Sequence, residues 1–241
     1  MSERVIFWDF DGTLALRVSG TWAAAMHEAL QELLPSTRLT TADFRPLLTS
    51  GFPWHTPETS HTHLLDPDDY WADMEQLFVR VYRRLGLTEH APSLAARVRW
   101  HYTRAEAWAL YADTLPTLQR LAALGWTHAL VSNHVPELPQ IAQALGLLPY
   151  LEVIVNSATV GYEKPHPVIF RLAREMTGYP CTVWMVGDNP VADVQGAEAV
   201  GIPAILVRQQ ADHASWQTPN LAGVVEIILA EGKHREMEGT R

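Results

Sequence analysis

The chain has 241 residues, of which 47% are hydrophobic and 19% are charged. Its 18 lysines and arginines stand against 27 aspartates and glutamates, a formal net charge of −9, which argues against nucleic acid or an anionic membrane surface as a partner. The hydrophobic fraction is enough for a packed core and excludes disorder of the whole chain.

Three features of the sequence bear on where the protein is located in the cell. No run approaches the roughly 18 to 20 consecutive apolar residues that a membrane-spanning helix needs. The first ten residues, MSERVIFWDF, contain no separate hydrophobic stretch that ends in a small-residue cleavage site. The single cysteine, Cys181, cannot form an internal disulfide, which fits a reducing compartment. We therefore expect a cytoplasmic protein that does not enter the membrane.

The first predicted element is a short strand from Val5 to Trp8, which stops at Asp9-Phe10-Asp11-Gly12. Apolar, β-branched and aromatic residues favour a buried strand, whereas Asp and Gly favour a tight turn. The sequence therefore predicts a strand that leads directly into a turn carrying two acids.

The next segment, residues 15–112, has helical patterns and no clear strand. Helices are expected over Trp22–Leu34, Asp43–Thr49, Asp68–Leu85 and Leu94–Trp108. One face of the third helix is apolar, with Tyr70, Met74, Leu77, Val81 and Leu85 at helical spacing. We interpret residues 15–112 as an inserted all-helical cap. Because it follows the first strand directly, it must lie above that strand's C-terminal end, where open parallel sheets bind ligands.

The rest of the chain alternates strands with helices. The expected strands are Thr127–Ser132, Val153–Asn156, Thr182–Gly187 and Pro203–Val207, and the expected helices are Thr114–Leu124, Pro136–Leu145 and Val168–Thr177. This alternation predicts right-handed crossovers and a parallel sheet with helices on both faces. The predicted fold is thus a three-layer α/β core from residues 1–14 and 113–241, and Gly232 to Arg241 are expected to form a frayed tail.

Polar side chains stand where the predicted strands end. Asp9 and Asp11 follow the first strand, and Ser132 and Asn133 lie at the end of the second. Lys164 lies in the connection after the third strand, and Asp188 follows the fourth, with Asp193 five residues further on. Groups at the C-terminal ends of neighbouring parallel strands converge on one crevice.

Three acids in one crevice predict a cation. Asp9, Asp11 and Asp188 repel one another unless a proton or a metal intervenes. Because their ligand atoms are all oxygens, they favour a hard cation such as Mg²⁺ over zinc. Gly12 allows either a positive φ or a close approach of a ligand to the backbone.

A cation and several hydrogen-bond donors in the same crevice suggest an anionic substrate. Lys164 can neutralise a phosphate or offset the carboxylates, and Ser132 with neighbouring backbone amides can donate to phosphate oxygens. We therefore assign substrate binding to Gly12, Thr13, Ser132, Asn133 and Lys164.

These motifs, taken in their order along the chain, resemble those of a known family. DFDGT, VSN, the Lys-Pro pair and GDNPVAD, each after a hydrophobic strand, closely resemble the four-motif signature of the haloacid dehalogenase (HAD) superfamily, in its phosphatase form. The resemblance covers the core on both sides of the insertion. The place of the insertion resembles the helical C1 cap of that family.

The resemblance implies a mechanism. Asp9 would be the nucleophile that attacks phosphorus and forms an aspartyl-phosphate, and Asp11 would be the general acid and then the general base. Ser132 and Lys164 would hold the phosphoryl oxygens. The implied protein is a Mg²⁺-dependent phosphatase of a small phosphorylated metabolite.

The resemblance also implies the metal ligands. Asp188 would bind Mg²⁺ together with the Asp9 carboxylate and the backbone carbonyl of Asp11. Asp193 corresponds to the final acid of the family, which either binds the metal or orients Lys164.

Other functions are compatible with these motifs, because one fold supports several reactions. Haloacid dehalogenases lack the second acid of the first motif, so Asp11 argues against dehalogenation. A phosphomutase is a further alternative, although Thr13 resembles the phosphatase form. A non-catalytic phosphate-binding protein similar to a receiver domain is the third, but receiver domains are shorter and lack the cap.

The cap loop from Thr49 to Pro67 is expected to select the substrate, since Trp54, His55, His61 and His63 lie in it. Sugar phosphates, phosphoglycolate and nucleoside monophosphates are all candidates. The oligomeric state is left open.

Overall fold

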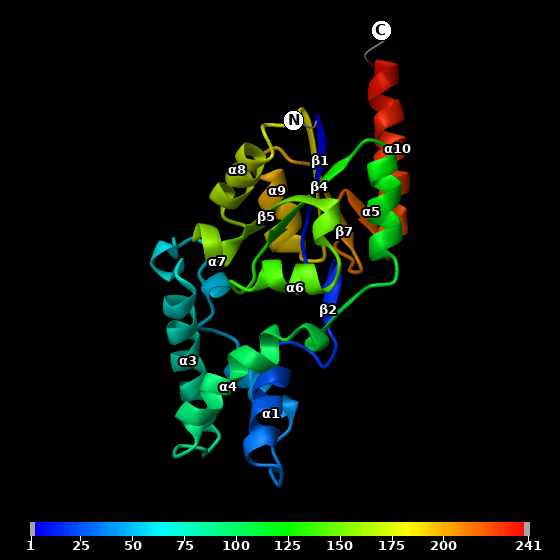
Figure 1. Ribbon diagram of the computed structural model, residues 1–241. Coiled ribbons are helices and arrows are strands. Elements are labelled where there is room, and N and C mark those ends of the chain that lie inside the picture. The colour runs from blue at the N-terminus through cyan, green and yellow to red at the C-terminus, as the bar shows by residue number, and fades with distance from the viewer. Residues whose placement is uncertain (1–2, 239–241) are drawn as a thin grey trace.

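The computed structural model describes residues 3–238 and is built around a six-stranded parallel sheet in the order β5-β4-β1-β6-β7-β8 (Figure 1). The strands are β1 (Arg4–Trp8), β4 (Thr127–Ser132), β5 (Leu151–Asn156), β6 (Thr182–Gly187), β7 (Ala204–Val207) and β8 (Trp216–Thr218). Trp8 at the end of β1 pairs with Leu130 of β4 and with Val186 of β6. The predicted α/β fold is confirmed, and the C-terminal ends of β1, β4 and β6 lie side by side.

Helices cover both faces of this sheet. They are α5 (Thr114–Ala123), α6 (Leu138–Ala144), α7 (Ser157–Val160), α8 (Pro167–Met176), α9 (Gly196–Glu198) and α10 (Leu221–Glu238). In Figure 1, α5 and α10 lie on one side of the sheet and α8 and α9 on the other. Ile6 and Trp8 enter the hydrophobic cluster on the α5 side, whereas Val5 and Phe7 enter the cluster on the α8 side. This alternation follows from the strand geometry, in which successive side chains point to opposite faces.

The insertion lies at the end of the sheet opposite both termini (Figure 1). Its helices are α1 (Trp22–Leu33), α2 (Thr41–Phe44), α3 (Pro67–Arg84) and α4 (Ala91–Thr103). Helix α3 begins where Asp66 accepts a hydrogen bond from the Asp68 amide at 2.8 Å. Its expected apolar face is buried, since Tyr70, Met74 and Leu77 are all at most 4% exposed. We use the word cap for residues 15–112, the boundaries proposed from the sequence.

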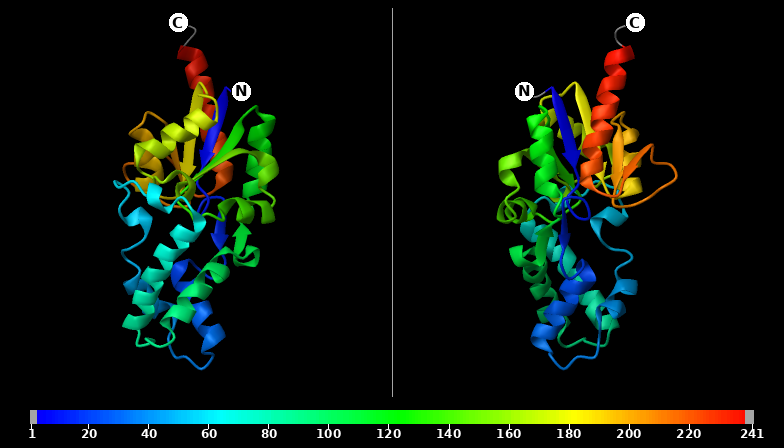
Figure 2. Two further views of the ribbon diagram at one scale, coloured as in Figure 1. Left: turned by 60° about the vertical axis from the view of Figure 1, so that its left-hand side comes forward. Right: turned by 90° about the vertical axis from the view of Figure 1, so that its right-hand side faces the viewer.

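The cap also contains two short strands that the sequence analysis did not predict. β2 (Ala15–Arg17) and β3 (Trp108–Leu110) pair antiparallel between the main sheet and the cap helices (Figure 2). Helix α4 therefore ends at Thr103 rather than at Trp108, and a 3₁₀ turn at Ala105–Ala107 leads into β3. Three residues are too few to show the two-residue alternation that identifies a strand.

The C-terminal part also differs from expectation. Strand β8 was not predicted, and α10 continues to Glu238, so most of the expected tail from Gly232 onward is helical. Glu, Ala, Leu and Lys are strong helix formers, and the two glycines of α10, Gly223 and Gly232, are tolerated. Residues 239–241 of that tail lie outside the described residues.

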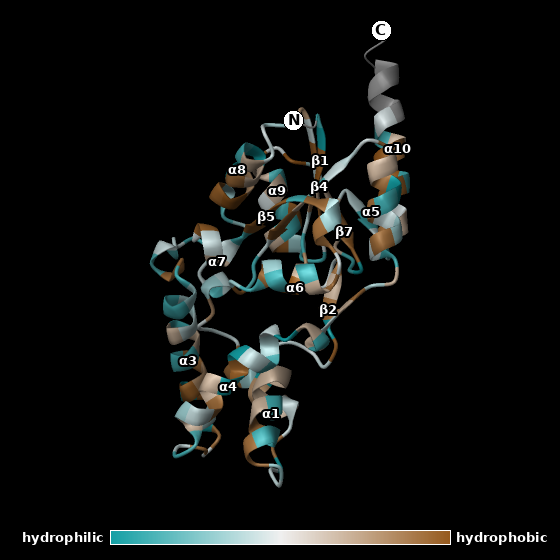
Figure 3. Cartoon of the chain, viewed as in Figure 1, coloured by the Kyte–Doolittle hydropathy of each residue, from teal (hydrophilic) through white to brown (hydrophobic). Residues whose placement is uncertain are grey.

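Hydropathy follows these layers. Brown hydrophobic residues mark the strands of the sheet, whereas helices such as α3, α4 and α10 carry both brown and teal residues along their length (Figure 3). Such mixed helices bury one face and expose the other. Among residues 3–238, none of the helices combines the length and the apolar character needed to cross a membrane.

Candidate active site

Three strand ends carry the predicted side chains. Asp9 comes directly after β1, Ser132 is the last residue of β4, and Asp188 comes directly after β6. The amide of Asp9 donates to the carbonyl oxygen of Val186 at 2.9 Å, which extends the parallel pairing one residue beyond β1. The sheet register therefore brings together residues that are far apart in the sequence.

Asp9 is oriented by three side chains. Its Oδ1 accepts hydrogen bonds from Ser132 Oγ at 2.9 Å and from Lys164 Nζ at 2.7 Å. Its Oδ2 accepts a longer one from Thr13 Oγ1 at 3.3 Å. The residue is only 7% exposed, and it lines a cavity. The carboxylate is thus fixed in direction at the wall of that cavity.

Lys164 connects two of the acids. Its Nζ donates to Asp193 Oδ1 at 2.6 Å in addition to Asp9. Burial lowers the pKa of this amine, but the Asp193 and Asp9 carboxylates outweigh burial and raise the pKa above its usual value. Asn133 holds the Lys164 backbone on both sides, accepting from its amide at 2.6 Å and donating to its carbonyl oxygen at 2.9 Å. The ammonium group therefore stays charged and in place.

Two glycines allow the acids to approach the backbone. Gly12 has a φ of +85°, and a Cβ at this position would collide with the Asp188 carboxylate. A Cβ at Gly187 would collide in the same way with the Asp193 carboxylate. Only glycine fits at both positions without a shift of those acids.

Asp11 has a different environment from Asp9. It also lines the cavity. Burial and then the negative charge of Asp9 raise the pKa of Asp11 to about 7. A carboxyl group with this pKa carries a proton about half of the time at neutral pH, which suits it for proton transfer.

Three acids of the site are placed so that they could hold a cation. Asp9, Asp188 and Asp193 each offer one carboxylate oxygen, and these oxygens lie within 4.8 Å of one another. Burial and then the charges of Asp9 and Asp193 raise the pKa of Asp188 to about 8, because together they outweigh the opposing charge of Lys164. The donors are all oxygens, which suits Mg²⁺. The predicted ligand set named Asp11 in place of Asp193, and a contribution from the Asp11 carbonyl stays a prediction.

The cavity has a volume of about 470 Å³ and lies between the strand ends and the cap. From the strand ends it is lined by acids and their partners, namely Asp9, Asp11, Asn133, Lys164, Asp188 and Asp193. From the cap it is lined by Thr21, Trp22, Trp54, Pro57 and Tyr102. Within the described chain, Gly12, Thr13 and Ser132 do not line the cavity, and they touch the site through Asp188 and Asp9.

The three histidines of the cap loop are not among the described residues that line the cavity. Trp54 lines the cavity, but His55, His61 and His63 are not among its described lining residues. His55 Nδ1 accepts a hydrogen bond from the Phe52 amide at 3.3 Å, and the His61 amide donates to the Gly161 carbonyl oxygen at 2.8 Å. These two residues thus shape the loop and its contact with the core.

Sequence reasoning missed several residues of the site. Trp22, Tyr102 and His134 line the cavity but belong to no motif. His134 is 3% exposed, and neither ring nitrogen has a hydrogen-bond partner in the described chain. Burial lowers the pKa of His134 to about 4, so the ring is uncharged at neutral pH. The position of His134 directly after Ser132-Asn133 was the one available signal.

The sequence is similar to those of known proteins. A family model described as haloacid dehalogenase-like hydrolase matches residues 3–201. The glyceraldehyde 3-phosphate phosphatase of Methanopyrus kandleri is 30% identical over 58% of this chain and 62% of its own length. The phosphoserine phosphatase of Thermus thermophilus is 35% identical over 51% of each chain. The chain thus spans about half to three fifths of the length of these relatives.

Solved structures share the fold at low identity. The HAD hydrolase YfnB of Bacillus subtilis, solved with magnesium bound, has a TM-score of 0.70 at 17% identity, over 94% of this chain and 99% of its own. The 2-haloacid dehalogenase of Pseudomonas syringae has a TM-score of 0.62 at 21% identity, over 95% and 99%. From the motifs, the parallel sheet and the family match together, the chain belongs to the haloacid dehalogenase-like hydrolases.

Proposed function

We propose that this hydrolase is a Mg²⁺-dependent phosphatase that cleaves a small-molecule phosphate monoester through an aspartyl-phosphate at Asp9. The observation that carries the proposal is the Asp9 carboxylate, which is aimed at the cavity and shares its Oδ1 with Lys164 and Ser132. Phosphatases among the relatives support the reaction class. The lone cysteine supports a cytoplasmic location.

In the first step a carboxylate oxygen of Asp9 attacks phosphorus, and the bond between phosphorus and the ester oxygen breaks. The departing alkoxide takes a proton from Asp11, whose pKa of about 7 leaves it partly protonated near neutral pH. The products of this step are the free alcohol and a phosphorylated Asp9. Attack by a positioned carboxylate replaces direct attack by water on a stable ester.

In the second step Asp11, now ionised, accepts a proton from a water molecule. The resulting hydroxide attacks phosphorus, the bond to the Asp9 oxygen breaks, and inorganic phosphate leaves. Asp9 is regenerated as a carboxylate and Asp11 as an acid, so the cycle is balanced.

The remaining residues would bind the phosphoryl group and offset its negative charge. Lys164 lines the cavity and can donate hydrogen bonds to the phosphoryl oxygens. Ser132 orients the Asp9 carboxylate, and its donation to a phosphoryl oxygen stays a prediction. Asp9, Asp188 and Asp193 would hold Mg²⁺, which supplies positive charge that offsets the phosphate dianion. Asn133 positions Lys164 through its backbone.

The test is the variant Asp9→Asn, assayed by release of phosphate from p-nitrophenyl phosphate with Mg²⁺. We expect kcat to fall at least about 1,000-fold, since the amide is a poor nucleophile. Asp69→Asn, at an exposed position of α3, is the matched control and should keep its activity. Circular dichroism should show that both variants are folded. Substantial activity in folded Asp9→Asn, or none in the unmodified protein with Mg²⁺, would contradict the proposal.

A further inference from the structure

The wall of the cavity that faces the catalytic acids comes from the cap and is uncharged. It consists of Thr21, Trp22, Trp54, Pro57 and Tyr102. We call these five residues the cap wall. A phosphoryl group bound at Asp9 directs the rest of its ester toward this wall, because the opposite side of Asp9 is the end of the sheet. The cap wall therefore sets the chemistry of the leaving group.

Aromatic rings form most of the cap wall. Trp22 stacks on Tyr102 with ring centroids 3.8 Å apart and an angle of 8° between the planes. Trp54 stacks on the same Trp22 at 6.0 Å and 28°. Stacking covers the faces that these rings turn toward one another, and the parts that line the cavity are largely apolar. Contact with them stabilises an apolar group by removing both surfaces from water.

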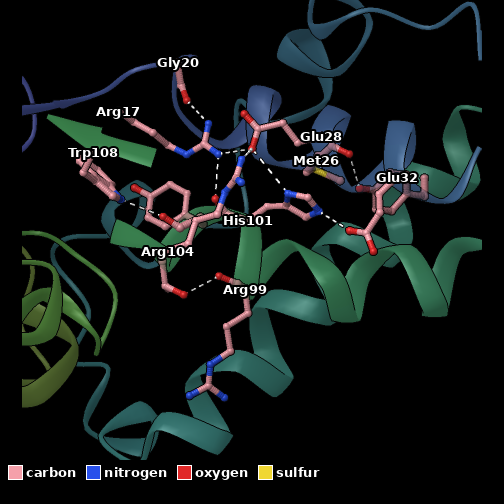
Figure 4. A network of polar contacts seen from close by, with 12 residues as sticks. Arg17, Gly20, Met26, Glu28, Glu32, Arg99, His101, Arg104 and Trp108 are labelled. Atoms are coloured by element: carbon pink, nitrogen blue, oxygen red, sulfur yellow. Dashed lines mark hydrogen bonds and ion pairs between the residues drawn. The ribbon is translucent and has the colours of Figure 1, made fainter. Parts of the chain in front are cut away.

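Arginine and histidine side chains near the cap wall are already paired with acids of the cap (Figure 4). Arg17 donates to Glu28 Oε2 at 2.6 Å, and Arg104 lies 3.4 Å from the same oxygen. His101 Nε2 lies 2.7 Å from Glu32 Oε2. Figure 4 shows these groups turned toward Glu28 and Glu32 in the cap. None of them is among the described lining residues of the cavity.

The cavity itself has little positive charge to offer. Lys164 is the one lysine or arginine among the described residues that line it, and its ammonium already contacts Asp9 and Asp193. The proposed Mg²⁺ belongs to the phosphoryl end of the cavity. A second negative charge on the substrate would therefore face the cap wall without a partner, at the cost of its desolvation.

We propose that the substrate carries an uncharged leaving group with an apolar face, and that esters bearing a carboxylate or a second phosphate on the leaving group are rejected. This inference rests on the proposed phosphatase function and names the substrate class of that site. The charge-free cap wall and the neutralised cations of the cap are the observations that support it.

The first test compares phenyl phosphate with 4-carboxyphenyl phosphate, which share one ring and differ by one charge. We expect kcat/KM to be at least about 10-fold higher for phenyl phosphate, a difference of the size that one unpaired charge produces in a partly buried site. Equal values, or a preference for the carboxylate, would overturn the inference alone. Release of phosphate from neither ester would overturn the proposed function as well.

The second test adds a charge to the cap wall. Thr21 is exposed, precedes α1, and makes no capping hydrogen bond with its side chain, so the site tolerates a longer residue. Thr21→Arg should shift the ratio of the two kcat/KM values toward 4-carboxyphenyl phosphate by about 10-fold relative to Thr21→Gln. The glutamine variant controls for size. The same ratio in both variants would show that the charge of the cap wall does not select the substrate.

A third test concerns the apolar surface. Trp54→Ala should lower kcat/KM for phenyl phosphate several-fold, whereas the inhibition constant of inorganic phosphate should change little, because free phosphate does not reach the cap wall. Thermal unfolding of the variant checks its folding. If kcat/KM for phenyl phosphate did not change, or if the affinity for inorganic phosphate weakened by the same factor, Trp54 would not contact the leaving group.

Discussion

Two acids, Asp11 and Glu163, have similarly raised pKa values but differ in their access to the cavity. Asp11 and Glu163 both have a pKa of about 7, and for both the largest cause is burial. Asp11 lines the cavity and can exchange its proton with a substrate. Glu163 is 2% exposed, lies next to Lys164 in the chain, and has an unpartnered Oε2. Because Glu163 is not among the described residues that line the cavity, we expect its proton to affect stability.

Glu163→Gln tests this assignment through the pH dependence of stability. The folded pKa of Glu163, about 7, exceeds its unfolded value of 4.5. The folded state thus binds the extra proton, and its stabilising contribution is complete below pH 4.5 and is lost as the pH rises through 7. Glutamine stays neutral, so we expect Glu163→Gln to be more stable than the unmodified protein at pH 8, by about 3 kcal/mol, and about equal at pH 4.5.

The measurement is urea denaturation at both pH values. Glu175→Gln, at an exposed position of α8, is the control and should change little at either pH. A gain of the same size at both pH values would show that Glu163 does not hold a proton in the folded state.

Among the helices and strands, the length of an element determines whether it can be predicted from the sequence. Helix α3 shows its apolar face over 18 residues, and its predicted range agrees with the structure to within a residue at each end. β2 and β3 have three residues each and were missed, although they carry the chain between the sheet and the cap helices. Arg17 on β2 was missed with them, since a lone arginine has no pattern. Its side chain is fully buried against Glu28.

A double-mutant cycle tests whether this pair stabilises the base of the cap. Glu28→Gln leaves the Arg17 guanidinium buried without its closest carboxylate, so we expect a loss of about 3 kcal/mol in the free energy of unfolding. Combined with Arg17→Met, the loss should be less than the sum of the two single losses, with a coupling energy of about 1 to 3 kcal/mol.

The exposed pair Arg120 and Glu226, at 3.1 Å, provides the matched cycle. Its coupling energy should stay below about 1 kcal/mol, because solvent screens exposed charges. Coupling energies of similar size in the two cycles would mean that burial does not strengthen the Arg17 to Glu28 contact.

For the whole molecule, the order of the motifs predicted which polar residues meet at the strand ends, whereas of the cap residues that line the opposite wall only Trp54 was named as a site residue from the sequence. Parallel pairing forces the ends of β1, β4 and β6 together, so residues that follow those strands could be placed from the sequence. The cap wall instead combines Thr21, Trp22, Trp54 and Tyr102, which come from separate cap segments. Their meeting depends on helix packing, for which the sequence has no comparable rule.

We expect the stability of the protein to depend on both Mg²⁺ and pH. Three acids near the proposed metal site, Asp11, Asp188 and Asp193, have pKa values raised to about 7, 8 and 6, chiefly by burial. They bind protons in the folded state, so the metal-free protein loses stability as the pH rises through these values. Mg²⁺ competes with those protons. It should therefore raise the thermal midpoint by several degrees at pH 8 and by clearly less at pH 6.

A protein with a net charge of −9 is also stabilised by any cation through screening, so the effect must be separated from ionic strength. Sodium chloride at matched ionic strength measures screening alone, and Asp188→Asn removes one ligand of the proposed site. Asp212→Asn, at an exposed position, removes the same charge elsewhere. We expect the response to Mg²⁺ to persist in Asp212→Asn and to fall to the sodium chloride level in Asp188→Asn. An equal response in both variants would assign the stabilisation to the charge of the whole molecule instead of to the proposed Mg²⁺ site at Asp9, Asp188 and Asp193.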